Sequence, residues 1–144
     1  MKFWDSSSVV CLVVGQKETD RLLSLLRKDP GVWVWWGTKV EAISALCRLE
    51  REGFFSSESF ALSSLKLDQL FSSWIEVDPD PAVKEIALRF LRVHPLRAAD
   101  ALQLAAAFTA SEHRPSTLEF VCLDKRLAEA ASREGFVVNF PAPT

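Results

Sequence analysis

Short runs of β-branched and aromatic residues alternate with helical segments along the chain, and this alternation restricts the possible folds more than any other feature. The runs predict five strands, over residues 2–4, 32–36, 75–77, 120–123 and 136–139. Apolar residues at three- and four-residue spacing predict helices between them, over residues 6–14, 19–28, 39–52, 57–73, 97–112 and 125–134, with a further helix after Pro81. Strands separated by helices pair in parallel through crossover connections. The predicted fold is therefore α/β, a three-layer α/β/α sandwich around a central, mostly parallel sheet of about five strands.

The chain has the length of a single domain. Its 144 residues are 49% hydrophobic, which suffices for one core, and no linker or repeat divides residues 1–144. The longest apolar stretches, such as residues 9–14, are far shorter than the ~18 residues that cross a membrane, and no cleavable leader is recognisable. Cys11, Cys47 and Cys122 are odd in number and lie among apolar neighbours, which favours free thiols. We expect one cytoplasmic domain that does not enter a membrane.

The charge balance argues against a protein that simply coats nucleic acid. The 17 basic and 19 acidic residues give a formal charge of −2. An enzyme that gathers carboxylates around a metal is compatible with this balance, because its remaining residues are then slightly basic. Neither of the usual nucleotide-binding glycine motifs occurs, and the serines at 6–8 have no evident histidine partner for a catalytic triad.

Four acidic residues are expected at the carboxyl ends of the strands, where ligands bind in such folds. Asp5 ends the first strand, Glu41 opens the helix after the second, and Asp124 ends the fourth. Asp100 lies near the start of its helix, in the run L-R-A-A-D-A-L-Q-L, on the same face as Leu104. A buried carboxylate without a partner costs several kcal/mol, so Asp100 must meet either water at the helix end or a cation.

Each acid also has an ordinary structural interpretation. Asp5 and Asp124 are good helix N-caps. Residues 38–41, T-K-V-E, match a capping box in which Glu41 reaches back to the Thr38 amide. Asp100 is favoured near a helix N-terminus by the helix dipole. The four acids together still point to a site, because caps alone would be distributed over both edges of the sheet.

A cluster of four carboxylates requires protons or cations. Two carboxylates ~5 Å apart repel each other by about 3 kcal/mol at an effective dielectric constant near 20. Hard oxygen ligands select Mg²⁺ or Mn²⁺, which keep several waters and accept a phosphate oxygen. In phosphodiester hydrolysis such a metal activates a water and neutralises charge on the scissile phosphate. The acids therefore predict metal-dependent phosphodiester hydrolysis.

Other polar and aromatic residues have less specific interpretations. Ser6 is placed to hold a carboxylate or a metal-bound water. Basic residues adjoin the acids in the sequence, either to bind phosphate or as ordinary surface charge: Lys39, Arg97, Lys125 and Arg126. Three tryptophans are expected mainly in the core, with base stacking as the alternative: Trp33, Trp35 and Trp36. His94 and His113 are the only histidines, and a role as ligand or general base is not favoured for either.

Four segments match a known order of motifs: M-K-F-W-D-S-S-S, T-K-V-E-A-I-S-A-L, H-P-L-R-A-A-D-A-L-Q-L-A-A-A and F-V-C-L-D-K-R-L-A-E-A-A-S-R-E-G-F-V-V. They resemble the successive motifs of PIN-domain ribonucleases, specifically the VapC-like toxins of toxin–antitoxin pairs, from near residue 1 to about residue 139. The resemblance implies a PIN-like fold and a Mg²⁺- or Mn²⁺-dependent endoribonuclease whose catalytic, metal-binding acids are Asp5, Glu41, Asp100 and Asp124. It also implies an RNA substrate, a homodimer, and a cognate antitoxin protein that covers the active site.

Two positions depart from the family pattern. Cys122 stands two residues before the last acid, where Ser or Thr is common, and a thiol is a weaker donor for orienting Asp124. Trp4 is bulkier than the residue that usually precedes the first acid.

Two alternative functions follow from the same sequence. One is a catalytically inactive PIN-like module that binds RNA or protein, against which the four retained acids argue. The other is a receiver-type phosphoacceptor domain, whose paired acids after the first strand and lysine after the fifth are missing here.

Overall fold

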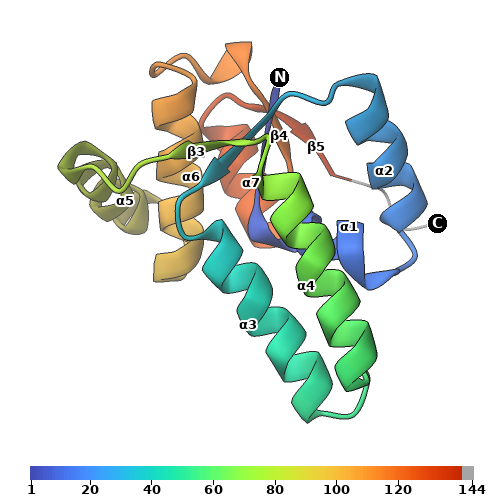
Figure 1. Cartoon of the computed structure of the whole chain (residues 1–144). Coiled ribbons are helices and arrows are strands. Elements are labelled where there is room, and N and C mark those ends of the chain that lie inside the picture. The colour runs from blue at the N-terminus through green and yellow to red at the C-terminus, as the bar shows by residue number, and fades with distance from the viewer. Residues whose placement is uncertain (141–144) are drawn as a thin grey trace.

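A five-stranded, entirely parallel sheet forms the centre of the molecule, with strand order β3-β2-β1-β4-β5 (Figure 1). The computed structural model describes residues 1–140. The strands are β1 (Lys2–Trp4), β2 (Val32–Trp35), β3 (Ile75–Val77), β4 (Glu119–Val121) and β5 (Val137–Asn139). All five predicted strands are present, and their bounds lie within two residues of the predicted ones.

Seven α-helices connect the strands: α1 (Ser6–Val14), α2 (Thr19–Lys28), α3 (Thr38–Arg51), α4 (Ser57–Phe71), α5 (Pro81–Val93), α6 (Ala98–Ala110) and α7 (Lys125–Arg133). A single 3₁₀ turn, Pro115–Thr117, was not expected from the sequence. Glu52 is the C-cap of α3, and Gly53 after it has φ +82°, a left-handed conformation that glycine adopts easily. The long pair α3 and α4 extends beyond the sheet, below it in Figure 1.

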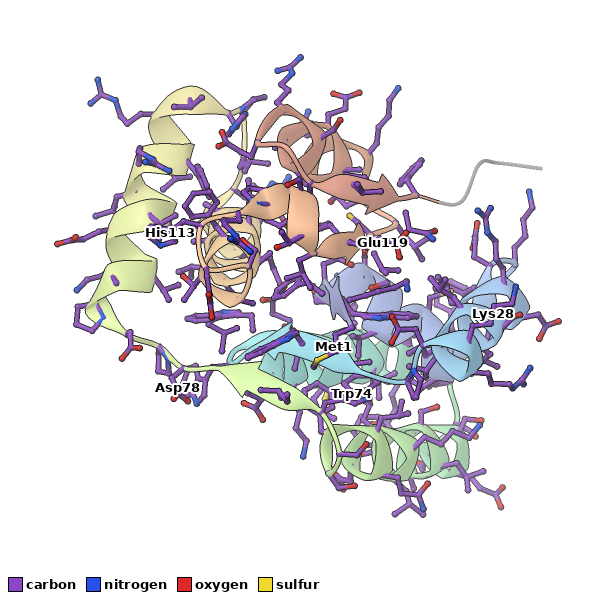
Figure 2. All side chains as sticks on the ribbon, turned by 90° about the horizontal axis from the view of Figure 1, so that it is seen from above. Met1, Lys28, Trp74, Asp78, His113 and Glu119 are labelled. Carbon is purple, nitrogen blue, oxygen red and sulfur yellow. The ribbon has the colours of Figure 1, made fainter. Side chains whose placement is uncertain are left out.

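Helices cover both faces of the sheet, so the molecule has two hydrophobic cores. Alternation along β1 sends Phe3 into one core, with residues of α5, α6 and α7, and Trp4 into the other, with residues of α1 to α4. Figure 2, which looks from above, shows the yellow and orange helices α5 and α6 on one side and the cyan and green helices α3 and α4 on the other. The predicted three-layer α/β/α sandwich is confirmed. Trp4 is fully buried, which explains where this bulky residue goes.

The expectation for the tryptophans is met at two of three positions. Trp35 is buried on β2 and Trp33 packs partly against the same core. Trp36 is 53% exposed, because the strand ends at Trp35 and the chain turns at Gly37 before α3 begins. Trp36 is therefore not a core residue.

The fourth strand lies one to two residues earlier than predicted. It covers Glu119–Val121, whereas the apolar run suggested 120–123. Beyond Val121 the backbone leaves the ladder to β1, since the Leu123 amide donates to the Ser7 hydroxyl instead. Apolar character alone could not locate this departure, because Cys122 and Leu123 are apolar as well.

The chain connections place a topological switch between β1 and β4. From β1 the chain proceeds to β2 on one side, while β4 pairs with β1 on the other side. The crevice beyond the carboxyl ends of β1 and β4 is the usual ligand position in open α/β sheets.

Among the described residues no helix has the length and apolar composition needed to span a membrane. The three cysteines are all free.

Candidate active site

The four predicted acids meet at one pocket beyond the carboxyl ends of β1 and β4. Asp5 directly follows β1, Glu41 and Asp100 lie in the first turns of α3 and α6, and Asp124 precedes α7. All four line the same open cavity of about 370 Å³. They come from four separate parts of the chain, so only the folded sheet brings them together.

Asp5 is both a helix cap and a member of this pocket. Its side chain is buried, at 2% exposure, and its Oδ1 accepts the Ser8 amide at 3.0 Å as the N-cap of α1. The Ser7 hydroxyl donates to the same carboxylate at 2.7 and 2.8 Å, and Cys122 Sγ lies 3.3 Å from Oδ2. Burial raises the pKa of Asp5 above its ordinary value even though these donors act to lower it. The cap and the site are therefore compatible uses of one carboxylate.

Glu41 is held by partners from two other helices. The Ser6 hydroxyl donates to Oε2 at 2.8 Å, and Gln103 Nε2 donates to Oε1 at 3.1 Å. Burial and, more weakly, the charge of Asp5 raise the pKa of Glu41. The capping-box interpretation is wrong: Gly37 is the N-cap of α3, and Thr38 Oγ1 accepts from Gln103 Nε2 at 3.0 Å. Thr38 is the first residue of the helix and not its cap, so the Glu41 side chain does not fold back to the Thr38 amide and lines the pocket instead.

Asp100 is half-buried at the start of α6, and the rest of its helix is more deeply buried. Leu104 and Ala107 on the same side are completely buried in the core. Burial raises the pKa of Asp100, the charges of Asp124 and Glu41 raise it further, and Arg97 opposes the shift. Its place on an apolar face thus follows from a helix whose first turn faces the pocket and whose later turns enter the core.

Asp124 is the N-cap of α7, since its Oδ1 accepts the Leu127 amide at 3.1 Å. The Asp124 amide lies 3.2 Å from Cys122 Sγ, so the thiol contacts both Asp5 and the segment that carries Asp124. Burial and then the Asp5 charge raise the pKa of the Cys122 thiol far above its ordinary value. Cys122 is therefore a neutral thiol between two acids.

Ser7 and Gln103 are polar residues that contact the acids and that sequence reasoning missed. Ser7 joins the Asp5 carboxylate to the Leu123 amide, and thereby links the segments that follow β1 and β4. Gln103 is fully buried and bridges Thr38 and Glu41. A sequence signal exists for Gln103, because a polar residue three positions after Asp100 lies on the same side of an otherwise apolar helix.

The predicted phosphate-binding residues divide into two groups. Arg97, Lys125 and Arg126 line a second cavity of about 450 Å³, which shares Asp100 and Asp124 with the first. Lys39 is elsewhere: its Nζ pairs with Asp68 at 2.7 Å and lies over the Phe71 ring, so the fold does not bring it to either cavity.

Neither histidine reaches the acids. His94 is buried at the end of α5, where its Nε2 meets the Glu134 carboxylate, and His113 stacks on Phe108. Neither residue lines the pocket that contains the acids.

The donor set fits a hard divalent cation that keeps part of its water shell. Within residues 1–140 no three His, Cys, Asp or Glu side chains form a ready-made metal cage. Mg²⁺ rarely uses such cages and is usually bound through one or two carboxylates, with water and substrate oxygens completing the octahedron. Three acids whose pKa values are raised, two of them by neighbouring acids as well as by burial, would be relieved by a cation.

Solved structures share this fold, although sequence comparison alone finds no relative. No protein-family model and no curated protein matches the sequence. A toxin–antitoxin complex from Klebsiella pneumoniae matches with a TM-score of 0.64 and 16% identity, over 89% of this chain and 91% of that chain. FitAcB from Neisseria gonorrhoeae matches with a TM-score of 0.67 and 17% identity, over 98% and 97%. PAE2754 from Pyrobaculum aerophilum matches with a TM-score of 0.67 and 20% identity, over 95% and 87%. These matches confirm the predicted PIN-like α/β fold.

Proposed function

We propose that this protein is a metal-dependent endoribonuclease toxin that hydrolyses RNA phosphodiester bonds. The observation that carries the proposal is the convergence of Asp5, Glu41, Asp100 and Asp124 on one open pocket at the topological switch of the sheet. Four carboxylates that line one pocket, one of them the buried Asp5, favour a bound cation. A cation at this position attracts the anionic backbone of a nucleic acid.

Asp5, Glu41 and Asp100 would hold one Mg²⁺ or Mn²⁺, and Asp124 would complete that site or a second one. When bound, the metal would supply positive charge toward the scissile phosphate and activate a water. The protein's own contribution is to hold the acids in place. Ser7 and Cys122 fix Asp5, while Ser6 and Gln103 fix Glu41. Arg97, Lys125 and Arg126 would bind phosphate groups beside the acids.

The proposal includes two partners and a place of action. A cognate antitoxin protein would cover the acidic pocket, and the toxin–antitoxin complex among the structural neighbours supports this. A homodimer is supported by α5, which exposes the apolar side chains Leu88, Leu91 and Val93. The three free cysteines are compatible with action in the cytoplasm.

Replacement of Asp5 by Asn tests the function. We expect Asp5→Asn to lower Mg²⁺- or Mn²⁺-dependent RNA cleavage by more than about 100-fold, the upper range for groups that merely support a metal ligand. The fold should persist, because asparagine also caps helices well. Mg²⁺ should raise the melting temperature of the unmodified protein and not that of the variant.

Asp78→Asn is the matched control for this experiment. Asp78 follows β3 as Asp5 follows β1, yet it is exposed and lies outside the acidic pocket. The Asp78→Asn variant should cleave RNA at the same rate as the unmodified protein. Full metal-dependent cleavage by a folded Asp5→Asn protein would contradict the proposal.

An inactive PIN-like module that binds RNA or protein is the second candidate, and one observation favours it. Asp5 already accepts hydrogen bonds from Ser7 and Ser8, so its carboxylate is stabilised without a metal. RNA binding with no cleavage in Mg²⁺ or Mn²⁺ would establish this alternative. The receiver-type function has no such support.

A further inference from the structure

The acidic pocket continues along α3 to a cationic residue that has no assigned role. One face of α3 lines this pocket, with Glu41, Ser44, Ala45 and Arg48 at three- and four-residue spacing. Arg48 lies two turns beyond Glu41, about 10 Å farther along the helix axis. The pocket therefore has carboxylates at one end and a guanidinium at the other.

A second cavity leaves the acids in another direction. It shares Asp100 and Asp124 with the first cavity, and its other lining residues include Arg97, Lys125 and Arg126. Arg97 is the N-cap residue of α6, and Lys125 is the first residue of α7. The amino ends of two helices add to the positive potential there. The acids thus lie between two cationic regions, one formed by Arg48 and one by these three residues.

These cationic side chains are available for a ligand. Arg48, Arg97, Lys125 and Arg126 are exposed, and none forms an ion pair within 4.0 Å in residues 1–140. Lys39 and Lys2 are not available in this way, because Lys39 pairs with Asp68, and Lys2 pairs with Asp29 and Glu119. The four cations are distinguished by their place in the lining of the two cavities that contain the acids.

We infer that the two cavities form one continuous groove for single-stranded RNA, in which Arg48 binds a backbone phosphate on one side of the acids and Arg97, with Lys125 and Arg126, binds phosphates on the other side. This inference rests on the proposed function, since it assumes that RNA is the ligand. A mononucleotide or a chain end would need cations on one side only. A strand that continues in both directions matches cations on both sides.

RNA binding by charge-reversed variants tests the groove, and the measurement does not depend on cleavage. The parent is the Asp5→Asn protein, and the probe is a fluorescein-labelled, mixed-sequence single-stranded RNA in Mg²⁺, followed by fluorescence anisotropy over a range of salt concentrations. Arg48→Glu and Arg97→Glu should each weaken binding roughly 10-fold and reduce the slope of log K against log salt by about 0.7, the value for one lost phosphate contact on a single strand. In the double variant the fold loss of RNA affinity should equal the product of the two single losses, because the two sites are separate.

Two variants of α3 serve as controls. Arg51→Glu makes the same charge change one turn farther along the exposed helix, outside the groove, and should change affinity less than about 2-fold, since only long-range, screened electrostatics remain. Arg48→Lys keeps the charge and should bind close to the parent. Circular dichroism checks that each variant is folded.

The outcomes separate this inference from the proposed activity. If Arg48→Glu binds RNA as tightly as the parent, or if Arg51→Glu loses as much affinity as Arg48→Glu, the groove is overturned, even when the unmodified protein cleaves RNA. If the unmodified protein cleaves nothing but binding depends on Arg48 and Arg97 as described, the catalytic proposal fails and the groove stands. A parent that binds no RNA overturns the inference as well.

Discussion

Two of the carboxylates that line the acidic pocket also cap helices. Asp5 and Asp124 cap helices and also line the pocket, so the cap interpretation and the site interpretation hold together. This is possible because a carboxylate has two oxygens with several acceptor positions, and a cap uses only one of them. The buried Gln103 has a comparable role for Glu41, to which it donates while it also donates to Thr38.

Replacement of Gln103 by Leu should weaken metal dependence without preventing folding. Leucine has a similar volume but cannot donate to Glu41, so the Mg²⁺ concentration for half-maximal cleavage should rise roughly 10- to 100-fold. The loss of hydrogen bonds to buried groups should cost about 1–3 kcal/mol of folding free energy. Mg²⁺ titration of RNA cleavage and urea unfolding measure the two effects. Gln69→Leu on the exposed face of α4 is the control, and equal Mg²⁺ requirements in both variants would rule out a positioning role for Gln103.

Among the elements, α5 exposes three large apolar side chains, Leu88, Leu91 and Val93, whereas α4 exposes two, Leu62 and Leu65. Val83, Ala87 and Phe90 pack into the core, whereas Leu88 is 58% exposed and Leu91 lies one turn farther on the same outer face. An apolar outer face is unusual for a helix that is already packed on a sheet, and it suits contact with another molecule. The proposed homodimer gives this face a function.

Leu88→Asp should convert the proposed dimer to a monomer. A charge at the centre of an apolar interface loses its hydration on association, which costs several kcal/mol. The monomer fold should be unaffected because Leu88 is exposed, so urea unfolding should change little. Sedimentation velocity compares the variant with Leu62→Asp on α4, where an exposed leucine is replaced outside α5. Identical sedimentation of Leu88→Asp and the unmodified protein would show that α5 is not the interface.

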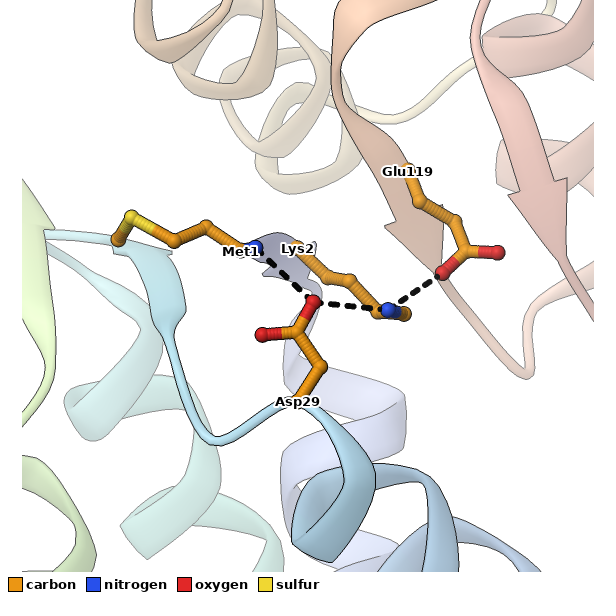
Figure 3. Close-up of polar contacts among 4 residues, drawn as sticks. All are labelled: Met1, Lys2, Asp29 and Glu119. Atoms are coloured by element: carbon orange, nitrogen blue, oxygen red, sulfur yellow. Dashed lines mark hydrogen bonds and ion pairs between the residues drawn. The ribbon is translucent and has the colours of Figure 1, made fainter.

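In the whole molecule, paired charges lie at the amino ends of the strands and the clustered acids lie at the carboxyl ends. At the amino ends of the strands, Asp29 pairs with Lys2 and with the Met1 amine at 2.9 Å each, and Lys2 also pairs with Glu119 at 3.1 Å (Figure 3). Hydrogen bonds from the Met1 amine and Lys2 lower the pKa of Asp29 to about 2. Burial acts to lower the pKa of Lys2, but its two carboxylate partners raise it overall. Opposite charges thus meet at the amino ends of the strands, and like charges meet at their carboxyl ends.

Acid should remove the contribution of Asp29 to stability. The pKa of Asp29 is lower in the folded chain than its ordinary value of 3.8, so its contribution is present above about pH 4 and is lost as the pH falls toward 2. Asp29→Asn should therefore be less stable than the unmodified protein at pH 7, by less than about 1 kcal/mol for so accessible a cluster. At pH 2 the difference should shrink. Urea unfolding at both pH values measures it, and a difference that grows at low pH would contradict the assignment.

The sequence by itself determined the order of strands and helices, the layered architecture and the positions of the acids, because these depend on local periodicity and on the edge to which parallel strands point. Helix bounds followed for the same reason, and α2 and β3 begin and end where predicted. Tertiary structure decided which side chains surround each acid. Ser7, Gln103 and Arg48 reach the pocket while Lys39 pairs with Asp68, and the capping box at Thr38 gives way to a contact with Gln103. These are contacts between residues far apart in the chain, whose geometry depends on how helices pack across the sheet. Local sequence spacing can place a residue on the same helix face as an acid, but it does not identify the partner across the sheet.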